Sequence, residues 1–357
     1  MPEGHSVHRI ARQFGRHFVG RRVSASSPQG RFADGAALID GRTMTDARAV
    51  GKQMFLEFDD AVWLRVHLGI YGAWDFAGAV ASATARPAAS DSSDASGASG
   101  AAERGMPTGR MGQTGMRGAS DDDDDAAAPT TVVGAHEESL ASIGAPRRTR
   151  LRMAEAETES AIDDLALEGF PPEPIGAVRV RLLTDSAVAD LRGPTACEVL
   201  DAAAVQQVID RLGPDPLIDD AEAGEERMLA RIRRRQVPIG LLLMDQSVVS
   251  GIGNVYRAEL LFRARLDPHT LGADLPEDVI RGLWRDWRYL LGVGVDTGQM
   301  LTMDGLDEEA RRLALRNRAD RHWVYKREGL PCRVCGTHIV MELAAARKLY
   351  YCPSCQV

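Results

Sequence analysis

The feature that most constrains this chain is a pair of cysteine knuckles near its C-terminal end. Cys332 and Cys335 are followed, after sixteen intervening residues, by Cys352 and Cys355. Two Cys-x2-Cys pairs at this separation can place four thiolates tetrahedrally around one Zn²⁺, which leaves no open coordination position for catalysis. We therefore predict one structural zinc ion, which folds a β-hairpin too short to have its own core. The fifth cysteine, Cys197, is expected to be an ordinary buried residue.

The length of 357 residues is enough for two or three domains. No stretch approaches the length of apolar sequence that spans a bilayer. The first five residues, Met-Pro-Glu-Gly-His, do not begin a basic segment followed by an apolar run, so no secretory signal is expected. The expected location is the cytoplasm, at the nucleoid, with no membrane partner.

The net charge of −8 is unevenly distributed along the chain. Residues 78–172 hold sixteen Asp/Glu and eight Lys/Arg, a net of −8, so the remainder sums to zero. Residues 227–265 carry eight Arg against two acids, and residues 321–357 carry six Lys/Arg against two acids. Local positive surface decides phosphate binding. From charge alone, these arginines could bind phosphate or could form a solvated face.

One long segment, about 78–172, has the composition of a disordered insertion. From about Gly78 to Gly144 it is mostly Ala, Gly, Ser and Asp, with an Asp run at 121–125. Such sequence buries too little apolar surface to offset the entropy of ordering it. A tolerated surface loop is the simplest explanation for it. The segment "RRTRLRM" at 147–153 could be a short strand or a basic arm.

The remaining sequence divides into three predicted domains, at 1–200, 201–300 and 320–357. In the first, the spacing of Val7, Ile10, Phe14 and Phe18 indicates one apolar face of a helix. Alternating or β-rich segments predict strands, at 52–58, 61–68, 177–183 and 188–193.

The second predicted domain is helical. Val205, Val208, Ile209 and Leu212 form one helix face, which ends at "GPDP" (213–216). Residues 225–245 indicate a further helical region with a break near Pro238. Gly251 and Gly253 indicate a tight turn, after which Asn254 is predicted to be a helix N-cap.

Several motifs occur in the order found in the formamidopyrimidine-DNA glycosylase/endonuclease VIII family. They are "MPEG" (1–4), "GKQMFLEF" (51–58), "HLGIYG" (67–72), "LGPDPL" (212–217), "DQSVVSGIGNVYRAELLF" (245–262) and "PCRVCG…YYCPSCQ" (331–356). The resemblance covers residues 1–76 and about 174–357. It implies an α+β architecture: an N-terminal antiparallel β-sandwich with a leading helix, a helical domain with a helix–two-turns–helix element, and a C-terminal zinc-finger β-hairpin. It also implies a monomer that binds damaged DNA without a small-molecule cofactor.

The resemblance implies three catalytic residues. Removal of the initiator Met leaves a secondary amine at Pro2, and an α-amino group is partly neutral at cellular pH. Attack of this amine on the sugar C1′ gives an iminium ion, from which β,δ-elimination nicks the strand. Glu3 matches the family's proton donor and acceptor, and Lys52 matches the lysine that acts in phosphate contact and catalysis. Taken alone, Pro2 could be a helix-starting proline and Glu3 could complement a helix N-terminus.

The resemblance also implies DNA contacts. Asn254 and Arg347 match residues that bind backbone phosphate, one at a helix N-terminus and one in the zinc finger. Ile70 and Tyr71 fall where the family places residues that fill the gap left by a flipped nucleotide, although Ile70 could also belong to the core. Arg192 lies where the guanine-directed branch has an Arg-Arg-Phe wedge.

Departures from the guanine-directed branch favour the endonuclease VIII-like branch. Gly4 replaces a leucine, residues 190–194 contain no Phe, and "VDTGQMLTM" (295–303) matches the loop over 8-oxoguanine poorly. We therefore predict a bifunctional DNA glycosylase/AP lyase of base excision repair that removes oxidised pyrimidines. Ser6 stands where many members have a carboxylate, which affects the lyase step. The alternatives are a guanine-directed glycosylase, a catalytically silent damage-binding protein, and a zinc-ribbon transcription or translation factor.

Overall fold

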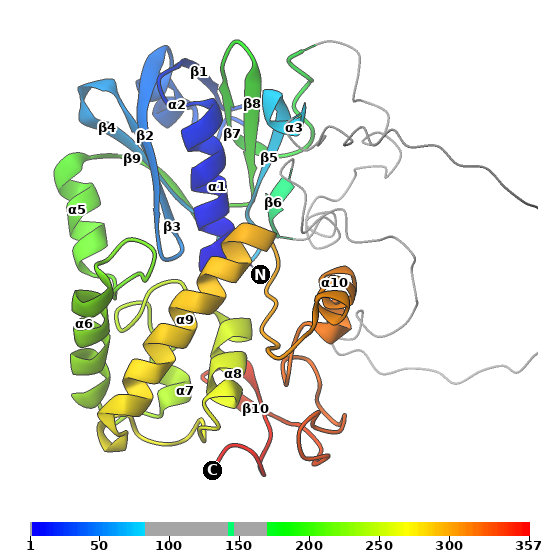
Figure 1. The fold of residues 1–357 in the computed structure, drawn as a ribbon. Coiled ribbons are helices and arrows are strands. Elements are labelled where there is room, and N and C mark those ends of the chain that lie inside the picture. Colours follow the sequence, from blue (N-terminus) through cyan, green and yellow to red (C-terminus); the bar gives the residue numbers. More distant parts are fainter. Residues whose placement is uncertain (1, 83–141, 146–169) are drawn as a thin grey trace, which may run out of the picture.

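The computed structural model describes residues 2–82, 142–145 and 170–357. Their N-terminal part is a nine-stranded antiparallel sheet in the order β6-β5-β8-β7-β1-β2-β3-β4-β9, which folds over helix α1 (Figure 1). The strands are β1 (Arg22–Ser26), β2 (Arg42–Val50), β3 (Gln53–Phe58), β4 (Val62–His67), β5 (Ala73–Gly78), β6 (Ser142–Gly144), β7 (Val178–Leu183), β8 (Ala187–Arg192) and β9 (Ala196–Asp201). Two short helices, α2 (Ala33–Ile39) and α3 (Ala79–Ser82), and the 3-10 turn η1 (Asp59–Ala61) connect them.

Helix α1 (Gly4–His17) provides one wall of the first hydrophobic core. Its apolar face is buried as the sequence predicts, and Phe14 packs edge-on against Trp74 of β5 with ring centroids 4.9 Å apart. Residues from both halves of the sheet join this core, including Leu56 of β3 and Leu182 of β7. The sheet is therefore a sandwich around α1, and this packing fixes the N-terminal end of α1 at the border with the helical domain.

The second core belongs to a bundle of helices that lies below the sheet in Figure 1. The helices after the sheet are α5 (Ala202–Asp210), α6 (Ala221–Arg233), α7 (Ile239–Leu242), α8 (Asn254–Arg263), α9 (Glu277–Thr297) and α10 (Glu308–Arg316), with 3-10 turns η3 (Gly272–Asp274) and η4 (Arg318–Asp320). Trp284 and Trp287 of α9 are fully buried against residues of α6 and α8. Helix α9 crosses toward α1, so the two domains meet at the N-terminal end of α1 (Figure 1).

The C-terminal part is a small hairpin, β10 (Val340–Ala344) and β11 (Arg347–Tyr351), which packs against α8. Its core contains Phe262 of α8 together with Val324 and Tyr350. Glu259 joins the finger to α8, because its buried carboxylate accepts backbone N–H bonds from Trp323, Val324 and Tyr325 at 2.7, 2.9 and 2.8 Å.

The predicted strands are confirmed as β3, β4, β7 and β8, with no end shifted by more than one residue. Ordered structure extends slightly past the insertion start that was predicted at about 78, because β5 continues to Gly78 and α3 follows it. Residues 142–144 also lie in a strand: β6 pairs with β5, and Ile143 is buried in the core. Residues 83–141 and 146–169 of the predicted insertion, which include "RRTRLRM" at 147–153, lie outside the described residues.

Within residues 2–82, 142–145 and 170–357, none of the helices combines the length and apolar character needed to cross a membrane.

Candidate active site and nucleic-acid interface

Two of the sequence motifs form one structural unit at the domain border. The loop containing "LGPDPL" and the loop 245–253 are cross-bonded: Gly213 N donates to the Gln246 carbonyl at 2.7 Å, and Ser250 Oγ donates to the Gly213 carbonyl at 2.7 Å. The Gln246 side chain then braces the following turn, since it accepts from Gly251 N and donates to the Ile252 carbonyl, both at 3.0 Å. The turn 251–253 is consequently held rigidly in front of α1.

Glycines allow the backbones of the two domains to touch at this turn. Gly4 N donates to the Gly251 carbonyl at 2.9 Å, and a Cβ on Gly4 would lie 2.9 Å from the Gly251 Cα. Gly51 and Gly251 both have positive φ, 59° and 90°, which favours glycine. A Cβ on Gly51 would meet Ser250 Cβ at 2.7 Å. Side chains at these positions would separate the N-terminus from the turn.

The Glu3 carboxylate is fully buried at the N-terminus of α8. Its oxygens accept from Gly253 N and Val255 N, both at 2.9 Å, and from Tyr256 N at 3.4 Å. These are N–H groups that a helix start leaves without intrahelical partners. The prediction that Asn254 is the N-cap is therefore wrong: Gly253 occupies the cap position, and a carboxylate from α1 takes over the capping bonds.

Lys52 reaches the same turn from the β2–β3 connection. Its Nζ donates to the Ile252 carbonyl at 2.6 Å. The pKa of Lys52 is lowered to about 8, mainly by burial; the charge of Glu3 opposes this shift and the charge of Arg347 adds to it. The predicted residues Glu3 and Lys52 are thus brought together at the turn 251–253, next to the buried Pro2.

Asp215 is a site residue that the sequence reasoning missed. Its carboxylate is fully buried, and Oδ2 accepts from Gly51 N at 2.6 Å and lies 2.8 Å from His8 Nε2. It therefore ties α1 and the turn carrying Lys52 to the helical domain. The available signal was the motif "LGPDPL", in which an acid stands between two prolines.

His5 and Ser6 lie behind the N-terminus. His5 Nε2 is 3.2 Å from Ser6 Oγ, and burial, followed by the charge of Arg9, lowers the His5 pKa to about 3. The imidazole is therefore neutral at physiological pH. Ser6, the position at which the sequence comparison expected a carboxylate in many members, is therefore part of a neutral hydroxyl–imidazole pair.

Asn254 links α8 to the zinc finger. Its Nδ2 donates to the Lys348 carbonyl of β11 at 2.8 Å, and its Oδ1 accepts from Arg257. Arg347, the residue before Lys348, is exposed and lies close enough to Lys52 and Arg257 to lower the pKa of each. Lys52, Asn254 and Arg347 thus lie near the N-terminal end of α8, where the two cations provide positive charge for a phosphate beside the Glu3 cap.

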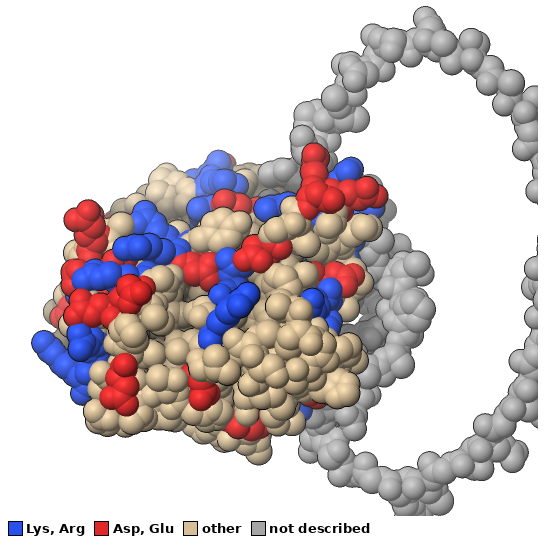
Figure 2. Space-filling model, turned by 60° about the horizontal axis from the view of Figure 1, so that its bottom comes forward, with Lys and Arg blue, Asp and Glu red and all other residues tan. Residues whose placement is uncertain are grey.

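The arginines of residues 227–265 are mostly not a free basic patch. They pair with acids distant in sequence, as in Arg233–Glu277 at 2.5 Å and Arg263–Asp286 at 2.7 Å. Figure 2 agrees, because Lys and Arg side chains alternate with Asp and Glu over much of the face it shows. The sequence count of local charge therefore overstates the positive surface of the helical domain.

Ile70 and Tyr71 lie at the tip of the loop between β4 and β5, and their exposed fractions are 49% and 39%. Ile70 is therefore not a core residue. The loop is held tightly against residues 193–195, since a Cβ on Gly69 would overlap Thr195 Oγ1. Arg192 is not free: its Nε donates to Asp75 Oδ2 at 2.9 Å and its Nη1 to the Ile175 carbonyl at 2.6 Å. A DNA contact by Arg192 stays a prediction.

The four predicted zinc ligands converge. Their sulfur atoms all lie within 4.8 Å of one another, with Cys332–Cys355 at 3.9 Å and Cys335–Cys352 at 3.5 Å. Zinc–sulfur bonds of about 2.3 Å in a tetrahedron require sulfur separations of roughly 3.8 Å. The four thiols therefore fit one zinc ion.

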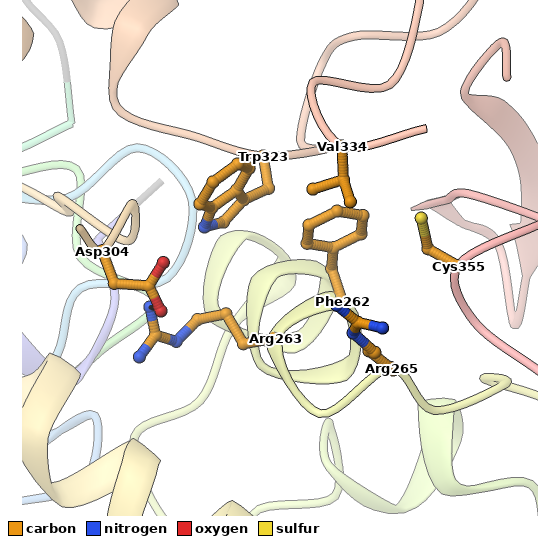
Figure 3. Close-up of a pocket in the computed structure, with 7 residues that line it drawn as sticks. All are labelled: Phe262, Arg263, Arg265, Asp304, Trp323, Val334 and Cys355. Atoms are coloured by element: carbon orange, nitrogen blue, oxygen red, sulfur yellow. Dashed lines mark hydrogen bonds and ion pairs between the residues drawn. The ribbon is translucent and has the colours of Figure 1, made fainter. Parts of the chain in front are cut away.

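A cavity of about 170 Å³ lies between the C-terminal end of α8 and the finger (Figure 3). Phe262 and Trp323 stack beside it, and Arg263 pairs with Asp304 at its edge. It is smaller than the roughly 300 Å³ of an ordinary ligand pocket, and it is at the opposite end of α8 from Glu3. It is therefore not a pocket for a flipped base.

Three family descriptions match the chain. They are the formamidopyrimidine-DNA glycosylase N-terminal domain at residues 1–99, the formamidopyrimidine-DNA glycosylase H2TH domain at residues 212–304, and the zinc finger found in FPG and IleRS at residues 329–357.

Two relatives differ in how much of the chain they match. Endonuclease 8 1 of Mycobacterium tuberculosis is 34% identical over 356 residues, covering 100% of each chain. Formamidopyrimidine-DNA glycosylase of Thermus thermophilus is 39% identical over 147 residues, covering 41% of this chain and 54% of its own.

Solved structures share the fold. The Fpg protein of Thermus thermophilus superposes with a TM-score of 0.61 at 20% identity, covering 99% of this chain and 98% of its own. A complex between the Lactococcus lactis Fpg and an abasic site containing DNA superposes with a TM-score of 0.60 at 16% identity, covering 99% of each chain.

Proposed function

The chain belongs to the formamidopyrimidine-DNA glycosylase/endonuclease VIII family of base-excision-repair DNA glycosylases with AP lyase activity, and we propose that it acts through Pro2 on oxidised pyrimidines. The observation that carries the site assignment is the docking of the Glu3 carboxylate on α8, beside Lys52. This arrangement brings the Glu3 carboxylate and the Lys52 cation to the turn 251–253, and Pro2 directly precedes Glu3 in the chain.

In the proposed reaction the Pro2 nitrogen attacks the sugar C1′, and the damaged base leaves with a proton. Glu3, held by the N–H groups of α8, takes the proton that the Pro2 nitrogen loses and passes it to the ring oxygen, so that the C1′–O bond breaks and an iminium ion forms between C1′ and the Pro2 nitrogen. The iminium withdraws electrons from C2′, loss of a proton there expels the 3′-phosphate, and a further elimination expels the 5′-phosphate. Lys52 and the phosphate ligands Asn254 and Arg347 hold the strand in register.

The zinc ion has a structural part in this proposal. When bound by the four cysteines, it stabilises the hairpin that carries Arg347. Because the amine supplies the electrophilic intermediate, no reaction step depends on the metal.

The preference for oxidised pyrimidines rests on two observations. The relative called Endonuclease 8 1 matches over the whole chain, whereas the formamidopyrimidine-DNA glycosylase of Thermus thermophilus matches 41% of it. The region of the guanine-directed wedge contains no Phe, and its Arg192 is held by Asp75. Ile70 and Tyr71 are the proposed side chains that fill the gap after base flipping, since they project from a braced loop.

Borohydride trapping tests the nucleophile. Reduction of the iminium should yield a stable enzyme–DNA adduct on a duplex with an abasic site, and peptide mapping should place it at Pro2. The matched control is the same chain with one extra residue before Pro2, which converts the amine to an amide and should give no adduct. Activity of the chain with the extra residue before Pro2, or an adduct mapped to Lys52, would refute the assignment of Pro2 as the nucleophile.

A panel of single-lesion duplexes tests the substrate class. Thymine glycol, dihydrouracil and 5-hydroxyuracil should be excised faster than 8-oxoguanine and formamidopyrimidines. The reverse order would establish the guanine-directed alternative, and binding without cleavage of any duplex would establish a silent damage-binding protein.

A further inference from the structure

Arg257 is a fully buried cation that the proposed mechanism does not use. It stands on the first turns of α8, three residues after Asn254. Its pKa is lowered to about 10, mainly by burial and in part by the nearby charge of Arg347. The guanidinium therefore remains charged at neutral pH, although it lies near the positive end of a helix, where a cation is unfavourable.

The partners of Arg257 are oxygen atoms of amides. Nη2 donates to Asn254 Oδ1 and to the Lys348 carbonyl, the latter at 2.9 Å, and Nη1 donates to the Gly240 carbonyl at 3.4 Å. Nε is buried without a partner among the described residues. In that part of the chain no carboxylate lies within ion-pairing distance of Arg257, and Glu3 and Glu342 act on it only from further away.

A buried charge without a carboxylate costs free energy, and packing alone would be served better by an apolar residue. What the guanidinium achieves is a fixed geometry. One nitrogen bonds both the Asn254 side chain and the backbone of β11, and Asn254 Nδ2 bonds the same Lys348 carbonyl at 2.8 Å. These three bonds join Arg257, Asn254 and Lys348, so the orientation of the Asn254 side-chain amide is fixed. They also fix the position of β11, the strand that carries Arg347.

We propose that Arg257 is a positioning residue for DNA binding. Its side chain holds Asn254 of α8 and the zinc-finger strand that carries Arg347 together as one phosphate-binding unit. This rests on the proposed phosphate contacts of Asn254 and Arg347. Arg257 itself does not touch DNA, because no part of its side chain is exposed. Its positive charge also adds to the potential at the point where the two ligands meet.

A double-mutant cycle tests the proposal by binding rather than turnover. The probe is a duplex with a tetrahydrofuran abasic analogue, and the variants are Arg257→Met, Asn254→Ala and the double variant. Arg257→Met should weaken binding by roughly 2- to 150-fold, the range of coupled contacts. In the Asn254→Ala background it should weaken binding by a clearly smaller factor, because the part of the effect that acts through Asn254 is already lost. The charge-matched control is Arg285→Met on α9, an exposed residue paired with Glu225, which should leave affinity unchanged.

A purely structural role predicts a different pattern. It would lower thermal stability but cost the same affinity with or without Asn254, and that additivity would overturn the proposal, as would unchanged affinity in Arg257→Met. If Arg257→Met does not fold, Arg257→Lys replaces it, because an ammonium cannot reproduce the planar fork. The same loss of additivity is expected there, and additivity would again refute the idea. Failure of the Pro2 assignment would leave these binding results intact, whereas a full-affinity Asn254→Ala would refute the phosphate assignment itself.

Discussion

Gly253→Ala isolates the contact between α8 and the Glu3 carboxylate. The backbone of Gly253 is extended, with φ −118° and ψ −159°, so alanine can adopt it without strain. The added Cβ, however, would lie 2.3 Å from Glu3 Cδ and 2.5 Å from Oε1. The substitution therefore acts first on Glu3, through space.

The magnitude follows from these distances. Ordinary contact begins near 3.4 Å, so the carboxylate must retreat by about 1 Å, which stretches both 2.9 Å bonds beyond useful length. Hydrogen bonds to charged groups contribute about 1.5–3 kcal/mol each to stability. A displacement of about 1 Å costs catalysis on the order of 100-fold, equal to about 2.7 kcal/mol of barrier.

Single-turnover excision on a lesion duplex measures the rate, and chemical denaturation measures the stability. The matched control is Gly282→Ala on α9, where nothing lies within 4 Å, which should keep the rate and gain about 0.4–1 kcal/mol. In a Glu3→Ala background, Gly253→Ala should no longer destabilise the protein. An unchanged rate in Gly253→Ala, or equal destabilisation in both backgrounds, would refute this account.

Three further outcomes are expected. Since burial lowers the Lys52 pKa to about 8, most of its positive charge is lost as the pH rises from 7 to 9. Over this range the DNA affinity of the wild type should fall up to about tenfold more than that of Lys52→Met, as measured by fluorescence anisotropy. Parallel pH profiles of the two proteins would contradict this. Cys352→Ser, which removes a fully buried ligand, should lower the zinc content and the melting temperature, and elemental analysis with unchanged zinc would count against the site. Glu259→Gln should lower the free energy of unfolding by about 3 kcal/mol in urea titrations, because the new amide N–H₂ would face backbone N–H donors. A change under about 0.5 kcal/mol would refute the role of Glu259 in joining the finger to α8.

The sequence predicted those parts of the molecule that short-range patterns determine. The apolar face from Val7 to Phe18 became the buried side of α1, and two Cys-x2-Cys pairs became one thiol cluster. Ordered motifs located Glu3 and Lys52, and the structure brings them to the same turn.

The features that the sequence did not predict depend on contacts between residues that are distant in the chain. Capping rules look at neighbouring residues, and they selected Asn254, whereas the actual cap comes from Glu3, 250 residues away from Gly253. Counting local charge likewise could not see that Arg263 pairs with Asp286. The strand β6 was missed because three residues surrounded by low-complexity sequence show no period, and only their pairing with β5 identifies them.

Helix α8 is ten residues long, yet it holds the Glu3 carboxylate at its start, the β11 backbone through Asn254 and Arg257, and the backbone of 323–325 through Glu259. The finger is therefore not a transplantable module. An exchange of residues 320–357 between relatives would carry across the zinc ligands but leave behind the three α8 side chains that seat them. The boundary of a working chimera would have to lie before Gly253, so that the β10–β11 hairpin and helix α8 come from the same protein.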